Sequence, residues 1–163
     1  MELVRAHVLV CGGTGCTSSG SEKIIKEMEI QLKKNNIDKE VKVVRTGCFG
    51  LCALGPIVIV YPEGAFYSMV KPEDVQEIVE EHLLKGRIVK RLLYHETVEK
   101  DDTIKSLNQV DFYKKQLRIA LQNCGVINPE NIEEYIAFDG YKALGKVLTE
   151  MTPEQVIDIV KRS

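Results

Sequence analysis

Apolar residues up to residue 86 come in short runs, separated by two stretches with helical periodicity. The runs are rich in β-branched residues and predict four strands, over 3–10, 41–46, 57–61 and 65–70. Pro62 and Gly64 separate the last two runs and are typical of a hairpin turn. We therefore expect one sheet built from these strands.

Two helices are predicted in the same region. Ser19 and Glu22 have the spacing of a capping box, and the apolar residues after them stay on one helical face until Asn35. Pro72 begins the second helix, and Gly86 ends it. The order strand, helix, strand, strand, strand, helix predicts an α/β (α+β) domain with a small sheet and flanking helices.

The pattern changes after this region. Residues 87–110 are polar, lack clear periodicity and are predicted to form a connector. From Asp111 onward the pattern predicts a mostly helical tail, whose first helix ends at Cys124. Asn128 and Thr152 are expected to cap later helices, Thr152 through a capping box. The expected organisation is therefore a domain over 1–86, a connector over 87–110 and a helical segment over 111–163.

Composition and charge exclude several functional classes. The 163 residues include 22 Lys and Arg against 24 Asp and Glu, a net charge of −2, so there is no basic surface typical of nucleic-acid binding. The longest apolar run, 57–61, is far shorter than the ~20 residues of a membrane span. The first residues show no signal-peptide pattern, so we expect a cytoplasmic protein without direct membrane insertion. Clustered cysteines in that compartment indicate metal binding or catalysis more than disulfides.

Four of the five cysteines form two closely spaced pairs. Four residues separate Cys11 from Cys16, three separate Cys48 from Cys52, and 31 residues lie between the pairs. Each pair follows a predicted strand. Four thiolates in two pairs can bind either zinc or an iron–sulfur cluster, and the spacing alone leaves both possible. The fifth cysteine, Cys124, is expected to be a buried thiol at a helix end.

Glycines surround both cysteine pairs. They are Gly12, Gly13 and Gly15 in the first loop, and Gly47 and Gly50 in the second. Because glycine has no Cβ, its backbone N–H can approach a ligand closely. An iron–sulfur cluster carries excess negative charge and is stabilised and tuned by such donors. These five glycines are therefore the expected cofactor-binding residues if the cysteines hold a cluster.

Two other functions of the first loop fit less well. A glycine-rich turn between a strand and a helix resembles a dinucleotide-binding turn. The third glycine position, however, holds Thr17 or Ser18, and the second strand ends in Arg45 rather than an acidic residue. Redox-active thiols usually have the spacing Cys-x-x-Cys, which neither pair has. The sequence therefore assigns no catalytic residue.

The histidines and the helix glutamates give no second site. The three histidines are scattered, and none has metal-ligand spacing from a cysteine pair. His82 is expected to lie on the surface of the second helix, among glutamates that form a solvated face.

Together with the residues that follow them, the cysteine pairs resemble the thioredoxin-like [2Fe–2S] ferredoxin domain of complex I and NAD-linked hydrogenases. The resemblance continues through Gly55-Pro56, the hairpin 61–64 and the segment 70–75. It implies a thioredoxin-like sheet and a one-electron carrier. It also implies a [2Fe–2S] cluster bound by Cys11, Cys16, Cys48 and Cys52. The alternative function is a structural zinc-binding interaction module.

The tail resembles the start of the NADH-binding flavoprotein subunit of the same complexes. The matching motifs lie at 111–119, 123–125, 128–130, 140–144 and 151–154. In that family the FMN-binding loop and the NADH site follow this region, so the resemblance implies a chain truncated before them. FMN and NAD are therefore expected only in the missing remainder or in a partner subunit, and this chain is not expected to be catalytic alone. The implied partners are other subunits of an NADH-oxidising or hydrogenase complex.

Overall fold

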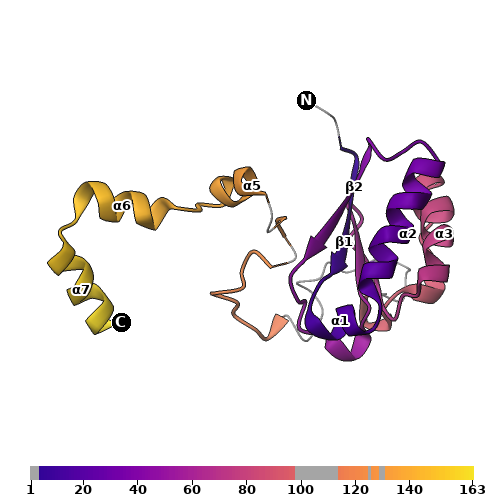
Figure 1. The fold of residues 1–163 in the computed structure, drawn as a ribbon. Helices are drawn as coiled ribbons and strands as arrows, with labels where there is room; N and C mark the ends of the chain where they lie inside the picture. The colour runs from indigo at the N-terminus through magenta and orange to yellow at the C-terminus, as the bar shows by residue number, and fades with distance from the viewer. Residues whose placement is uncertain (1–3, 98–113, 125, 129–130) are drawn as a thin grey trace. The chain divides into compact units, whose positions relative to one another are not determined.

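A four-stranded mixed sheet organises the first of two units in the computed structural model, which comprise residues 1–126 and 127–163. The structure describes residues 4–97, 114–124, 126–128 and 131–163. The strands are β1 (Ala6–Cys11), β2 (Val41–Thr46), β3 (Val58–Tyr61) and β4 (Ala65–Tyr67), in the spatial order β2-β1-β3-β4 (Figure 1). β1 is parallel to β2 and antiparallel to β3, which is antiparallel to β4. This is the small sheet that the sequence predicts.

The alternation of side chains along the strands divides the core into two clusters. Val8 and Val10 of β1 belong to a helix-side core, whereas Leu9 and Cys11 belong to a cysteine-side core on the other face. The helix-side core also contains Ile24, Met28, Val58, Val60, Tyr67, Val75, Ile78 and Val79, among others. The rest of the cysteine-side core is Cys16, Val44, Phe49, Ile57, Ile59, Phe66 and Tyr94. The alternation of side chains along β1 therefore buries Cys11 on the face of the sheet opposite α2 (Ser21–Lys34) and α3 (Val75–Glu77).

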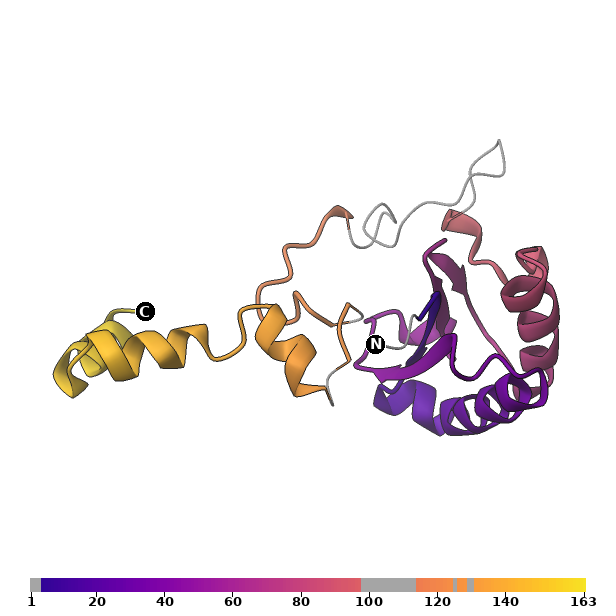
Figure 2. The same cartoon turned by 90° about the horizontal axis from the view of Figure 1, so that it is seen from above.

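Two helical segments contact each other and cover one face of the sheet (Figures 1 and 2). They are α2 (Ser21–Lys34) and α3 (Val75–Glu77), which η2 (Pro72–Asp74) precedes and the π-helical η3 (Ile78–Leu84) continues. Pro72 occupies the first position of η2, as predicted. Gly86 follows the helix with φ 67°, a left-handed conformation that suits glycine after a helix end. The second predicted helix is thus confirmed.

The start of α2 differs from the prediction. Its N-cap is Gly20 with φ 97°, and no side chain caps the helix. Glu22 forms an ion pair with Arg45 of β2 at 3.0 Å instead of reaching back to Ser19. The predicted capping box is therefore wrong, because a glycine in the left-handed region makes the turn into the helix. The end of α2 is as predicted, since Asn35 is the C-cap and its side-chain amide donates to a carbonyl one turn back.

Residues 87–97 pack on the sheet, although the sequence indicates a polar connector there. Val89, Leu92 and Tyr94 are buried. The N–H of Tyr94 donates to the carbonyl oxygen of Phe66 at 2.9 Å, and a bridge between Tyr67 and Leu93 extends the edge of the sheet. Basic residues separate these apolar positions in sequence, so the segment shows no clear periodicity. The sequence therefore does not predict that it pairs with β4.

The second unit is helical, as predicted. Its helices are α5 (Ile132–Ala137), α6 (Lys142–Glu150) and α7 (Pro153–Arg162). Thr152 caps α7 through the predicted capping box with Gln155. The N-cap of α5 is Asn131, whose side-chain oxygen accepts from the N–H of Glu133 at 3.0 Å, so the prediction of Asn128 is wrong. Among the described residues, no helix is both long and apolar enough to cross a membrane.

The first expected tail helix lies partly outside the described residues. Where the structure describes it, residues 116–118 have no regular secondary structure and 120–124 form turns. Leu117 is 86% exposed and Ile119 is 75% exposed, so the apolar positions that suggested a helix have no core to pack against. Lys114 is helical, but the described residues after it are not, so the expected helix does not continue to Cys124. Residues 98–110 lie outside the described part, and the domain limits 1–86, 87–110 and 111–163 stay a prediction.

His82 is buried within η3, so its expected place on the surface is wrong. The N–H of Val89 donates to the Tyr67 hydroxyl oxygen at 3.1 Å, which leaves the hydroxyl proton for His82 Nδ1 at 2.8 Å. The neutral ring then carries its proton on Nε2, which lies 3.5 Å from a carboxylate oxygen of Glu63. Burial lowers the pKa of His82, and Glu63 opposes that effect.

This buried histidine predicts a loss of stability in acid. Because the pKa of His82 is lower in the folded chain than in the unfolded one, the unfolded chain binds more protons. The contribution of neutral His82 to the free energy of unfolding is complete above the pKa of about 6.5 that histidine has in the unfolded chain. It is lost as the pH falls toward the lower pKa of the folded chain. Urea unfolding at a series of pH values should show this slope, and His82→Asn should flatten it. His7→Asn, at an exposed position of β1, should keep the slope; equal slopes in all three proteins would refute the assignment.

Candidate metal centre

The two cysteine loops leave the sheet at the same edge. Cys11 is the last residue of β1 and pairs in parallel register with Thr46, the last residue of β2. The N–H of Gly12 donates to the Thr46 carbonyl oxygen at 2.9 Å and extends this pairing by one residue. Parallel strands end side by side, so the first loop and the second loop, which begins at Gly47, start next to each other.

The first cysteine pair is buried. Cys11 lies in the cysteine-side core, and the short helix α1 (Thr14–Ser18) turns the chain so that Cys16 joins it; each is 1% exposed. Burial, together with the hydrogen bond to Cys11, raises the pKa of Cys16 to about 12. A thiol in this environment gives up its proton when it binds a metal cation.

The second cysteine pair is exposed. Cys48 and Cys52 lie in the loop after β2, with their Sγ atoms 3.7 Å apart, and Cys52 begins the 3₁₀ turn η1 (Cys52–Leu54). Gly50 has φ 83°, and its N–H donates to Cys48 Sγ at 3.3 Å. The hydrogen bond with Cys48 raises the pKa of Cys52. Gly50 is thus a predicted glycine that supplies an N–H donor to a cysteine sulfur.

Close packing around Cys16 and Cys48 leaves no space for a Cβ at two glycine positions. A Cβ on Gly13 would lie 2.8 Å from the Cβ of Cys48, and one on Gly55 would lie 2.6 Å from Cys16 Sγ. Both distances are too short for real Cβ atoms. A Cβ on Gly15 would make only an ordinary contact, at 3.7 Å. Gly13 therefore lets the first loop lie against the second, and Gly55 lets the chain pass over Cys16.

The other predicted glycines have different surroundings. The N–H of Gly12 donates to the Thr46 carbonyl oxygen. A Cβ on Gly47 would lie 2.8 Å from the sulfur of Cys124. Cys124 is half-buried and donates to the Cys48 carbonyl oxygen at 3.2 Å, so the expected core thiol at a helix end is wrong. The sequence offers no signal for this contact, because the two cysteines are far apart along the chain.

The arrangement of the four sulfur atoms fits a binuclear cluster. In the part of the chain that the structure describes, no group of three or more His, Cys, Asp or Glu side chains is arranged to hold a metal ion. Cys11 hydrogen-bonds Cys16, Cys48 adjoins Cys52, and each pair lies within electrostatic reach of the other. Two adjoining pairs provide two sulfur ligands for each of two iron ions.

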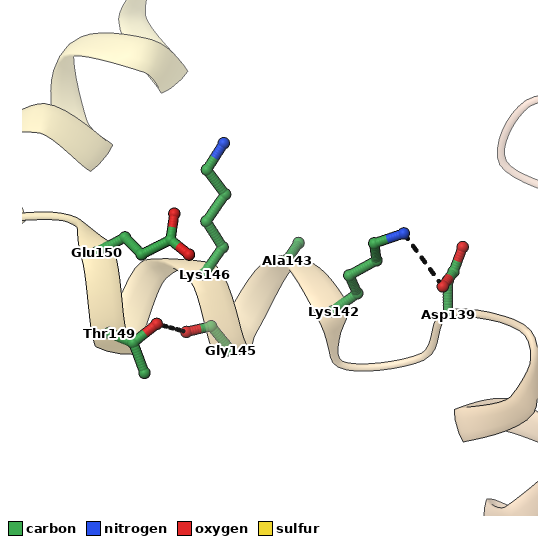
Figure 3. A pocket seen from close by; sticks show the side chains of 7 residues that line it. All are labelled: Asp139, Lys142, Ala143, Gly145, Lys146, Thr149 and Glu150. Atoms are coloured by element: carbon green, nitrogen blue, oxygen red, sulfur yellow. Dashed lines mark hydrogen bonds and ion pairs between the residues drawn. The ribbon is translucent and has the colours of Figure 1, made fainter.

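A hollow in the second unit offers no comparable chemistry. It follows one side of α6, has a volume of about 720 Å³ and is open to solvent (Figure 3). Its lining is Asp139, Lys142, Ala143, Gly145, Lys146, Thr149 and Glu150. Lys142 pairs with Asp139 at 3.3 Å, and the Thr149 hydroxyl donates to the Gly145 carbonyl at 2.9 Å. The polar side chains of Asp139, Lys142 and Thr149 therefore interact locally within the unit, and the candidate centre remains at the cysteine loops.

Comparison with known proteins gives consistent similarities. Residues 2–83 match the family model of the thioredoxin-like [2Fe-2S] ferredoxin. The chain is 48% identical over 96 residues to a 2Fe-2S ferredoxin of Clostridium pasteurianum, a match that covers 54% of this chain and 94% of that protein. The crystal structure of the wild-type thioredoxin-like [2Fe-2S] ferredoxin from Aquifex aeolicus aligns with a TM-score of 0.50 at 36% identity, covering 57% of this chain and 97% of that one. The expected thioredoxin-like fold is confirmed.

A shorter stretch resembles a hydrogenase subunit. Over 50 residues, the chain is 66% identical to the NADP-reducing hydrogenase subunit HndC of Solidesulfovibrio fructosivorans. This match covers 31% of the chain but 10% of that subunit.

The glycine contacts predict how tightly a cluster is held. Gly13→Ala places a Cβ where Cys48 lies, and such overpacking costs about 1–3 kcal/mol. We expect this variant to retain clearly less iron per chain after anaerobic purification than the unmodified protein. Gly15→Ala, two residues away with space for a Cβ, is the matched control and should retain normal iron. Equal iron content in the two variants would contradict the close packing of the loops.

Proposed function

The chain belongs to the thioredoxin-like [2Fe-2S] ferredoxin family, and we propose that Cys11, Cys16, Cys48 and Cys52 are the ligands of its cluster. As a member of this family it carries electrons on a [2Fe–2S] cluster. Such a cluster takes up and releases one electron, at a potential set by hydrogen bonds to sulfur, burial and nearby charge. The observation that supports this ligand set most strongly is the convergence of the two cysteine pairs at one edge of the sheet.

The two pairs would perform different tasks. The buried Cys11 and Cys16 would hold the cluster against apolar side chains, which exclude water from that side. The exposed Cys48 and Cys52 would form the side through which electrons enter and leave. Gly50 would supply an N–H donor to sulfur, and such donors raise the potential by stabilising added negative charge. No proton-transferring side chain is needed for this reaction.

The similarity to a hydrogenase subunit suggests where the electrons go. The match to HndC, together with the tail motifs that resemble an NADH-binding flavoprotein subunit, supports a place in an NAD-linked hydrogenase or dehydrogenase complex. In that complex this chain would pass single electrons, while FMN and NAD would be bound by the remainder of such a subunit or by a partner subunit. The physiological partners would be the other subunits of that assembly.

The exposed cysteines lie in a part of the sequence without charged side chains. Residues 11–21 and 46–62 contain no Asp, Glu, Lys or Arg. Met69 is 60% exposed, and its N–H donates to the Leu54 carbonyl oxygen at 2.8 Å, which places it beside the second loop. Methionine adapts its shape and is common at binding surfaces. The redox partner would therefore present an uncharged, apolar contact surface to this edge.

Ala53 offers a direct test of the partner's surface. It is exposed within η1, next to Cys52. If the partner surface is apolar, both Ala53→Glu and Ala53→Lys bury a charge without a counter-charge and slow electron transfer, by roughly tenfold or more. Ala53→Gln, of similar length and without charge, is the control and should have a small effect. The measurement is electron transfer to the hydrogenase or dehydrogenase assembly that co-purifies with the chain. A slower Glu variant with a faster Lys variant, or the reverse, would instead reveal a charged partner surface.

Cluster identity is tested on the purified protein. Anaerobic preparations should contain about two iron and two sulfide per chain and give an EPR signal on reduction with dithionite. Replacement of Cys11, Cys16, Cys48 or Cys52 by Ser should remove or strongly destabilise the cluster, whereas Cys124→Ser should retain it. Stoichiometric zinc without iron, from cells supplied with iron, would support the zinc module instead.

A further inference from the structure

We propose that Cys124 is a positioning residue that holds the second cysteine loop through a hydrogen bond from its thiol to the backbone of Cys48. The inference rests on the proposed ligand role of Cys48. It adds to that site a contact made by Cys124, a residue outside both cysteine loops. Cys124 belongs to the segment 114–126 of the first unit, whereas Cys48 follows β2. The contact therefore joins two distant parts of the sequence at the candidate metal centre.

The thiol donates to an oxygen and not to a sulfur. Cys124 Sγ lies 3.2 Å from the carbonyl oxygen of Cys48, within the range of a hydrogen bond from sulfur. A cysteine S–H is a weak donor, and this one comes from a half-buried side chain. The bond leaves the Cys48 sulfur free to bind iron while restraining the backbone that carries it.

The second loop has a matching space for this thiol. Gly47 precedes Cys48, and a Cβ built on it would lie 2.8 Å from Cys124 Sγ. Any larger residue at position 47 would have to displace the thiol. The Cys124 sulfur thus lies against the backbone of Gly47 while its S–H donates to the carbonyl of Cys48. A residue that displaced the sulfur from Gly47 would therefore also break this hydrogen bond.

The backbone of Cys124 is itself held within its own segment. Its N–H donates to the Leu121 carbonyl oxygen at 3.0 Å, and Arg118 donates to the Cys124 carbonyl oxygen at 3.3 Å. These two bonds form a short turn that presents the thiol to the loop. The local geometry around Cys124 is therefore set by bonds within its own segment and not by the cysteine loop.

The loop has need of such a restraint. Residues 47–51 have no regular secondary structure, and Cys48 is exposed. Phe49 anchors the loop in the cysteine-side core, Gly50 donates to the Cys48 sulfur, and the Cys124 thiol adds a hydrogen bond to the Cys48 carbonyl. Without Cys124 the ligand backbone would sample more positions, which should loosen the cluster and broaden the range of its geometries.

The test compares five variants of the chain after anaerobic reconstitution. In the presence of a chelator, Cys124→Ala should lose its visible absorption about three to ten times faster than the unmodified protein, the range expected for one hydrogen bond. Its reduced EPR signal should have broader lines. Cys124→Ser keeps a donor and should stay within about twofold of the unmodified rate. Gly47→Ala displaces the thiol and should resemble Cys124→Ala.

The double variant separates a specific contact from general damage. Once Cys124→Ala removes the sulfur, Gly47→Ala has space for its Cβ, so the double variant should lose the cluster no faster than either single variant. Gly145→Ala, in the second unit with nothing near its added Cβ, is the control and should match the unmodified protein.

Two results would overturn the proposal. One is a Cys124→Ala protein with unchanged loss rate and EPR lines; the other is a double variant whose acceleration equals the product of the two single effects. If Cys124→Ala fails to fold by circular dichroism, the Gly47→Ala and Cys124→Ser rates decide in its place. Failure of the proposed function would look different from failure of this inference. In that case the unmodified protein itself would lack a [2Fe–2S] signal.

Discussion

The parallel register between β1 and β2 is the constraint on which the metal centre depends. It sets Cys11 opposite Thr46, so the two chains leave the sheet at the same edge and both cysteine loops begin there. A shift of one residue within β1 would reverse its faces, moving Cys11 from the cysteine-side core to the helix side. The register is held by the buried valines of both strands, so the hydrophobic core determines where the sulfur atoms meet.

The division of the core into two faces explains how a stable fold can present exposed ligands. On the helix side, α2 and η3 supply apolar side chains that pack with the sheet, and this cluster includes no residue of the cysteine loops. On the other face, Cys11 and Cys16 pack among aromatic and aliphatic side chains, while Cys48 and Cys52 remain exposed. A cluster bound there is anchored in apolar surroundings and accessible from solvent, which are the two conditions for a protein that exchanges electrons with a partner.

Local patterns predict much of this structure, and long-range contacts account for what they miss. The strand over 41–46, the helix begun by Pro72 and the capping box at Thr152 were predictable because neighbouring residues determine them. The cysteine pairs were evident from spacing, although their ligand role stays a proposal. The burial of His82, the packing of residues 87–97 and the contact of Cys124 with Cys48 were not predictable. Each depends on a partner that the fold supplies from a distant part of the chain.

The ligand set is tested most directly by anomalous diffraction from crystals of the anaerobically purified chain. Data collected on both sides of the iron absorption edge should give two peaks between the cysteine loops, within bonding distance of the four sulfur atoms of Cys11, Cys16, Cys48 and Cys52. Cys124 Sγ should remain unbonded to metal and directed at the Cys48 carbonyl. A single peak, a signal at the zinc edge, or Cys124 in place of one of the four cysteines would contradict this account.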